Sequence, residues 1–192
     1  MAWGKAGSTT LGSAGNTIDI SSLSDNKFNM VLADTIQSGA GTAYGGLRLN
    51  GDSGNNYSIR SSINGGTDGT GINQNKMSNG EGTDAAGESE FSVHYIMNIS
   101  SEEKLAIFDF TSNIAGTGAG YASGRRELVA KWANTSNAVD QITLSNIGTA
   151  IFDSNSNVSV LGSDLTPAAA VDAKVQDGAI FEETDTNKHY LL

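Results

Sequence analysis

The 192-residue chain contains no cysteine, a single proline and few charged side chains. The absence of cysteine excludes disulfides, thiolate metal sites and cysteine nucleophiles, so stability must come from packing. One proline among 24 glycines excludes collagen and proline-rich linkers. Charged residues make up 17% of the chain, so its polarity comes mainly from uncharged Gly, Ser, Thr and Asn, unlike most disordered sequences. We therefore expect a folded, turn-rich protein.

Positive charge is also scarce, because 11 Lys and Arg stand against 21 Asp and Glu and give a net charge of −10. This charge repels nucleic-acid phosphates and anionic lipid surfaces. No apolar run reaches the ~18 residues of a membrane span, and the residues after Met1 lack the apolar segment of a secretory signal. We expect a soluble protein that is made in a cytoplasm, with no nucleic-acid partner and no membrane partner.

Residues that carry catalytic chemistry are few. The two histidines are His94, in an apolar run, and His189, near the last residue, and neither belongs to a repeated metal-ligand spacing. The sequence has no Gly-x-Ser-x-Gly elbow and no phosphate-binding Gly-Lys-Ser/Thr loop. The sequence therefore predicts no catalytic centre, no enzyme activity and no required cofactor.

Apolar residues recur at every second position in short runs that are separated by Gly, Ser, Asn and Asp. This pattern predicts an all-β protein, an antiparallel β-sandwich of jelly-roll-like form. The hairpin between Phe91–Ile99 and Lys104–Thr111 has the clearest signal, because apolar strands flank a polar turn. The ten expected strands are Asn16–Ile20, Phe28–Ile36, Ala43–Asn50, Asn56–Ser61, Phe91–Ile99, Lys104–Thr111, Arg125–Ala133, Gln141–Ser145, Thr149–Phe152 and Asn157–Leu161.

Two glycine-rich connections interrupt the strands: Ser62–Glu90 and Ser112–Gly124. Each is interpreted either as a surface loop or as a loop that orders against a neighbour or a ligand.

Alternation within the expected strands also predicts the core. The expected core residues are Ile18, Ile20, Leu32, Leu47, Leu49, Ile96, Ile107, Leu128 and Ile142.

The composition changes after Gly162, so we divide the chain into a sandwich domain (1–162), a linker (163–176) and a C-terminal arm (177–192). Thr166 can cap a helix and Pro167 can occupy its first position, which predicts a short helix at Thr166–Lys174. Turn-prone residues in the arm predict a hairpin. Its apolar anchors are Phe181, Tyr190 and Leu192. Docking on a neighbouring subunit and docking on its own sandwich both remain open.

Two kinds of ligand site are candidates. Asp153, Asn155 and Asn157 supply the alternating oxygens of a calcium loop, but Val158 occupies the glycine position, which favours an Asn/Ser turn. Aromatic side chains can stack on the rings of a glycan, although core or interface packing is their commoner use. The candidate stacking residues are Tyr44, Tyr57 and Tyr121.

Four segments of the chain carry a resemblance to known proteins: Trp3–Ile18, Leu47–Tyr57, Val129–Ser136 and Asp177–Tyr190. Together they resemble small β-rich virion structural proteins of tailed viruses. The last segment contains the run FEETDTNKHY and is similar to a motif of phage tail-fibre and head-associated proteins. In those proteins the motif commonly continues into an aromatic-Asp-Gly segment, which is not present here.

The resemblance implies a virion component and does not fix its place on the particle. We expect a non-enzymatic structural protein that self-associates or decorates a capsid or a tail through its termini and glycine-rich loops. Its partners would be further copies of itself and other virion proteins, and it would be made in the host cytoplasm. Two other classes remain open: a carbohydrate-binding receptor module of a tail fibre, and a subunit of a cellular surface filament.

Overall fold

The computed structural model describes residues 3–78, 82–165, 180–183 and 188–191. All regular structure in these residues is β, and the strands pair antiparallel, which confirms the predicted all-β, sandwich-like fold. Within the same residues no helix is long and apolar enough to cross a membrane. The short helix expected at Thr166–Lys174 falls outside the described residues, as does Leu192.

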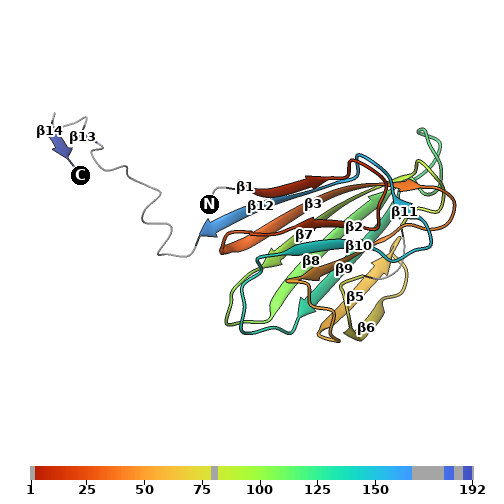
Figure 1. Cartoon of the computed structure of the whole chain (residues 1–192), viewed down its shortest axis with the longest axis horizontal. Coiled ribbons are helices and arrows are strands. Elements are labelled where there is room, and N and C mark those ends of the chain that lie inside the picture. The colour runs from red at the N-terminus through yellow and green to blue at the C-terminus, as the bar shows by residue number, and fades with distance from the viewer. Residues whose placement is uncertain (1–2, 79–81, 166–179, 184–187, 192) are drawn as a thin grey trace.

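A nine-stranded sheet forms one layer of the sandwich (Figure 1). Eight strands run side by side across it, and β11 (Ile151–Phe152) pairs with β3 off this path. The eight strands, in spatial order, are β1 (Gly4–Thr10), β12 (Asn157–Leu165), β3 (Asn26–Ser38), β7 (Ser89–Met97), β8 (Lys104–Ser112), β9 (Gly124–Trp132), β5 (Tyr57–Ile63) and β6 (Gly69–Gln74).

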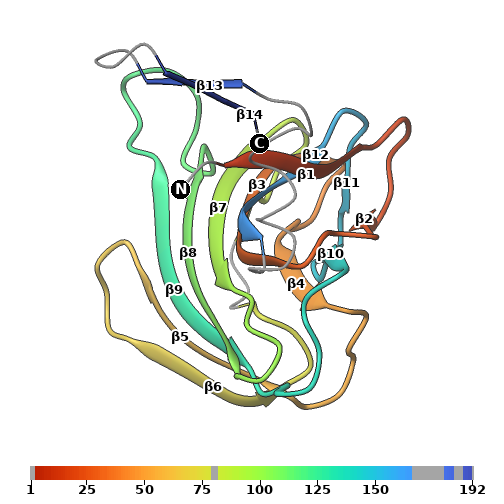
Figure 2. The same cartoon turned by 90° about the vertical axis from the view of Figure 1, so that its left-hand side faces the viewer.

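A smaller sheet of three strands lies against one face of the large sheet, and we call that face the inner face (Figure 2). It is formed by β2 (Thr17–Ile20), β10 (Ile142–Asn146) and β4 (Gly45–Leu49). Near the C-terminus, β13 (Ile180–Glu183) pairs antiparallel with β14 (Lys188–Leu191), and Phe181 is directly opposite Tyr190.

The core lies between the small sheet and the inner face. Alternate residues of each small-sheet strand point into it, which is the period-two pattern of a half-buried strand. Of the nine predicted core residues, seven are buried: Ile18, Ile20, Leu47, Leu49, Ile96, Leu128 and Ile142.

The predictions for Ile107 and Leu32 are wrong. Ile107 is 55% exposed because β8 buries the other alternation, which contains Ala106, Phe108 and Phe110. Leu32 is half-buried because its neighbours Val31 and Ala33 face the core. Both strands carry apolar residues on both faces, so alternation alone does not identify which face of the strand points into the core.

The predicted hairpin between β7 and β8 is present, with His94 opposite Phe108. Two strands were not predicted from the sequence. β1 is rich in Gly, Ser and Thr, and β6 lies inside the connection Ser62–Glu90. Neither strand has an alternating apolar pattern, and each is paired along its length with a stronger neighbour, β12 or β5.

Lys104, the first residue of β8, is fully buried. Its Nζ donates to the carbonyl oxygens of Ser100 at 3.3 Å, Glu102 at 2.6 Å and Asn134 at 2.8 Å. The ammonium also lies 5.8 Å from the ring centre of Trp132. Burial lowers the pKa of Lys104. The side chain thus ties the turn between β7 and β8 to the segment that follows β9.

Replacing Lys104 with methionine keeps an unbranched side chain that is one atom shorter, and it removes all three hydrogen bonds to carbonyl oxygens. We expect K104M to lower the free energy of unfolding by about 2–4 kcal/mol, because bonds to charged groups are strong and the carbonyls lose their partner. Urea unfolding measures the change. The matched control is K131M, whose exposed ion pair with Glu103 predicts a loss below about 1 kcal/mol. Equal losses in the two variants would contradict a structural role for Lys104.

Candidate functional site

The outer face of the large sheet, away from the small sheet, carries exposed apolar side chains. In β8 the alternation that buries Ala106 and Phe108 directs Leu105 and Ile107 outward. Leu105 is 53% exposed, Ile107 55% and Val129 of β9 50%. Large apolar side chains that are half exposed on neighbouring strands form a continuous surface rather than scattered single residues.

The strand register aligns these residues in a row across the sheet. Tyr95 of β7 is directly opposite Ile107, and Ile107 is directly opposite Val129. The row continues to Met30 of β3 on one side and to Arg60 of β5 on the other. Directly opposite residues in an antiparallel pair have neighbouring side chains, so the row is one contact surface over five strands.

This surface is hollowed into a groove of about 840 Å³, which we call the apolar groove. It extends from Trp3, next to β1, past Phe28 of β3, to Ile72 of β6. The large sheet curves strongly toward β5 and β6, as Figure 2 shows. The groove therefore crosses the sheet almost from one edge strand to the other, and its lining is mostly apolar.

Two cations, Arg60 and Lys131, line the groove, and none of the described acidic residues does. Arg60 Nη1 lies 3.4 Å from Asp68 Oδ2, and Lys131 Nζ lies 2.8 Å from Glu103 Oε2. Exposed pairs of this kind are weak, so either cation can exchange its carboxylate for an acidic group of a partner.

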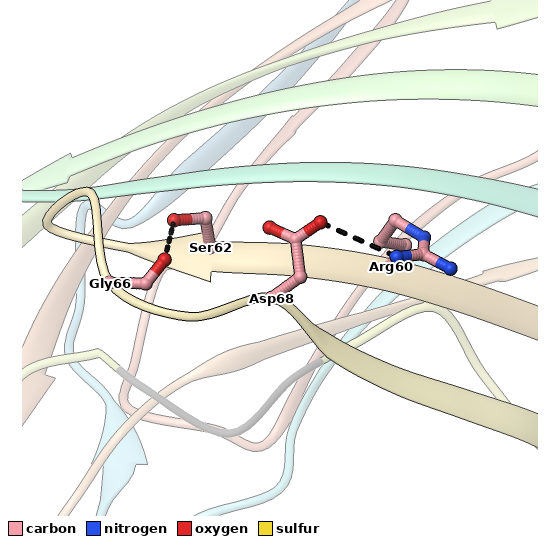
Figure 3. A network of polar contacts seen from close by, with 4 residues as sticks. All are labelled: Arg60, Ser62, Gly66 and Asp68. Atoms are coloured by element: carbon pink, nitrogen blue, oxygen red, sulfur yellow. Dashed lines mark hydrogen bonds and ion pairs between the residues drawn. The ribbon is translucent and has the colours of Figure 1, made fainter.

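The turn between β5 and β6 supports the Arg60 side of the groove (Figure 3). The Ser62 hydroxyl donates to the carbonyl of Gly66 at 2.9 Å, which closes the turn. Asn64 and Gly65 have φ values of 49° and 76°, the left-handed conformations that an Asn-Gly pair adopts readily. Asp68 follows this turn, and its carboxylate points toward Arg60.

Polar residues bound the apolar groove along the same strands. Two positions beyond Ile107, Asp109 of β8 is directly opposite Glu127 of β9. Arg125 Nη1 lies 3.8 Å from Glu127 Oε1. The outer face is therefore apolar at one end of β8 and β9 and charged at the other.

The tyrosines proposed for glycan stacking do not form this groove. Tyr57 is buried between the sheets, where its ring stacks on Trp132 with centroids 6.3 Å apart, so its prediction as a ligand-stacking residue is wrong. Its hydroxyl donates to the carbonyl of Asp52 at 3.1 Å. Tyr44 is half-buried before β4, and Tyr121 is exposed between β8 and β9. None of the three lines the apolar groove.

Two of the three candidate calcium residues have side chains that hydrogen-bond within the protein. The carboxylate of Asp153 accepts from the backbone N–H of Ser154 at 2.7 Å. The amide of Asn157 donates to the carbonyl of Thr9 at 3.1 Å. Asn155 has a φ of 70°, which is typical of asparagine in a tight turn. In the part of the chain that the structure describes, no three His, Cys, Asp or Glu side chains are grouped to hold a metal ion.

No protein-family model matches this chain, and a search of curated proteins found no significant match. The function therefore has to be argued from the geometry of the apolar groove and from the sequence itself.

Two titratable groups are buried on the inner face, away from the groove. His94 stacks on Phe108 with ring centroids 4.2 Å apart, and its Nε2 lies 2.9 Å from Ser92 Oγ. Burial lowers the pKa of His94 to about 3. Burial raises the pKa of Glu90 to about 7, although the nearby charge of Arg126 acts in the opposite direction.

These two groups make opposite contributions to stability in acid. Unfolded His94 takes up a proton below its usual pKa of 6.5 and the folded form does not until about pH 3, so stability is lost as the pH falls. Folded Glu90 takes up a proton near pH 7 and the unfolded form near 4.5, so stability is gained as the pH falls.

We therefore expect the variants H94Q and E90Q to change the pH dependence in opposite directions. Between pH 7.5 and 4.5, H94Q should lose less stability than the wild type, and E90Q should lose more. Denaturant unfolding of the three proteins at the two pH values checks this, and each variant serves as the control for the other. Shifts of the same sign would contradict the assignment.

Proposed function

We propose that this protein is a non-enzymatic structural subunit that self-associates through the apolar groove, as a component of a virus particle. The groove is the observation that carries the proposal. A concave apolar surface across six strands is larger than the isolated exposed residues of a monomeric protein and is typical of a protein–protein contact.

The lining of the groove favours a protein partner over a sugar. Sugar recognition needs several converging polar groups that hydrogen-bond to hydroxyls. Here the exposed residues are mainly apolar, and only two charged side chains, Arg60 and Lys131, line the groove. The buried positions of His94 and Glu90 support a role without catalysis, because neither side chain lines the groove.

The nature of the partner is supported by the sequence. The resemblance of four segments to virion structural proteins favours further copies of the same chain, since particles are built from repeated subunits. The net charge of −10 opposes association, but the two cations at the groove reduce this repulsion where the copies meet.

A charge placed in the groove tests the proposal. We expect the wild type to form oligomers whose population rises with concentration. I107E should shift this equilibrium to the monomer, because association would bury an unpaired carboxylate. The side chain of residue 107 is half exposed, so the fold should be kept. Sedimentation velocity over a concentration series measures the oligomers, and circular dichroism checks the fold.

The matched control is T111E, which places the same charge on the same face of β8 outside the groove. It should associate like the wild type. A wild type that stays monomeric at all concentrations, or an I107E variant that associates normally, would remove the basis of the proposal.

A further inference from the structure

We infer that the apolar groove receives the hairpin β13–β14 of a second copy of the chain. This inference rests on the proposed function and names the segment that fills the groove. It depends on four observations: the place where the chain leaves the sandwich, the length of the connection, the needs of an isolated hairpin, and the charges of the two surfaces.

The chain leaves the sandwich at one end of the groove. Leu165, the last residue of β12, is directly opposite Asn26, two residues before Phe28 of the groove lining. On the other side of β12, Gly162 is directly opposite Gly4, which follows Trp3 of the lining. The connection to the hairpin thus starts beside the groove.

The connection is long enough to reach a neighbouring copy. Residues 166–179 separate the end of β12 from β13, so 14 residues can span at most about 46–50 Å. Most connections in compact domains have about 2–6 residues, and a hairpin that docked beside its own β12 would need no more. The extra length lets the hairpin reach a groove on another copy.

The hairpin needs an apolar surface. Each of its strands has four residues, and an isolated two-stranded hairpin is marginally stable in water. Its sequence contains Ile180, Phe181, Tyr190 and Leu191, and the structure pairs Phe181 with Tyr190 and Ile180 with Leu191. The apolar groove offers the burial that such a hairpin lacks alone.

The charges of the two surfaces are complementary. Residues 180–191 contain Glu182, Glu183 and Asp185 against the single cation Lys188. The groove is lined by Arg60 and Lys131 and by none of the described acidic residues. Complementary charge helps to select the partner and its orientation. Exchange of an identical segment between copies is also a low-cost route to an oligomer.

The absence of cysteine makes a crosslinking test direct, because any thiol is one that we introduce. The full-length variants I107C, in the groove, and F181C, in the hairpin, are mixed in equal amounts under mild oxidation. We expect a disulfide-linked dimer of one I107C and one F181C chain, because docking brings the two thiols to millimolar effective concentration. The control T111C, mixed with F181C, should give at least about tenfold less of this dimer.

Two results overturn the inference. In the first, the I107C/F181C double variant forms its disulfide only within single chains, and the mixture of the two single variants gives no dimer. That result would mean that the hairpin docks on its own sandwich. The other is equal crosslinking from I107C and T111C, or none from either.

A second pair of variants separates this inference from the proposed function. F181E and Y190E in the full chain should lose association as I107E does. If they associate like the wild type while I107E stays monomeric, the groove is still the contact but the hairpin is not its occupant. If I107E also associates normally, the proposed function itself fails.

Discussion

A three-stranded sheet covers only one face of the nine-stranded sheet, and this asymmetry determines what the molecule presents to its surroundings. The inner face finds its apolar contacts within the chain, in side chains such as Leu47 and Ile142. Every strand of the large sheet also sends alternate residues to the outer face, which has no second layer in the described structure. The outward residues of β8 and β9 therefore decide the character of the free surface.

The fold does not require the outward residues of β8 and β9 to be apolar. Farther along the same strands and on the same face lie Asp109, Thr111 and Glu127, so β8 and β9 accept polar side chains at outward positions. Leu105 and Ile107 gain little from folding of a single chain because each remains about half exposed. A surface that changes from apolar to charged within one strand is better explained by a partner that covers only the apolar end.

The sequence was sufficient to predict the fold class, most strands and most of the core, because period-two alternation is strong where one face is polar. It was insufficient in β8, where Leu105 and Ile107 compete with Ala106 and Phe108 for the inward positions. The groove could not be predicted for a related reason: its residues extend from Trp3 to Lys131 and meet only through strand pairing. That pairing network includes β1 and β6, which lack an alternating apolar pattern, and β3 and β8, which carry apolar residues on both faces.

Polar contacts act together with the burial of Phe108 and Phe110 to decide which face of β8 points inward. Lys104 is held inside by three carbonyl oxygens, and this places Leu105 outside because successive side chains alternate. A slip of one residue would remove Lys104 from these partners and turn Phe108 toward solvent. A buried ammonium destabilises a fold unless its N–H groups are hydrogen-bonded. Loss of the three hydrogen bonds of Lys104 would therefore raise the free energy of the slipped register. The same contact that joins the turn of β7–β8 to the end of β9 thereby keeps the apolar groove on the outer face.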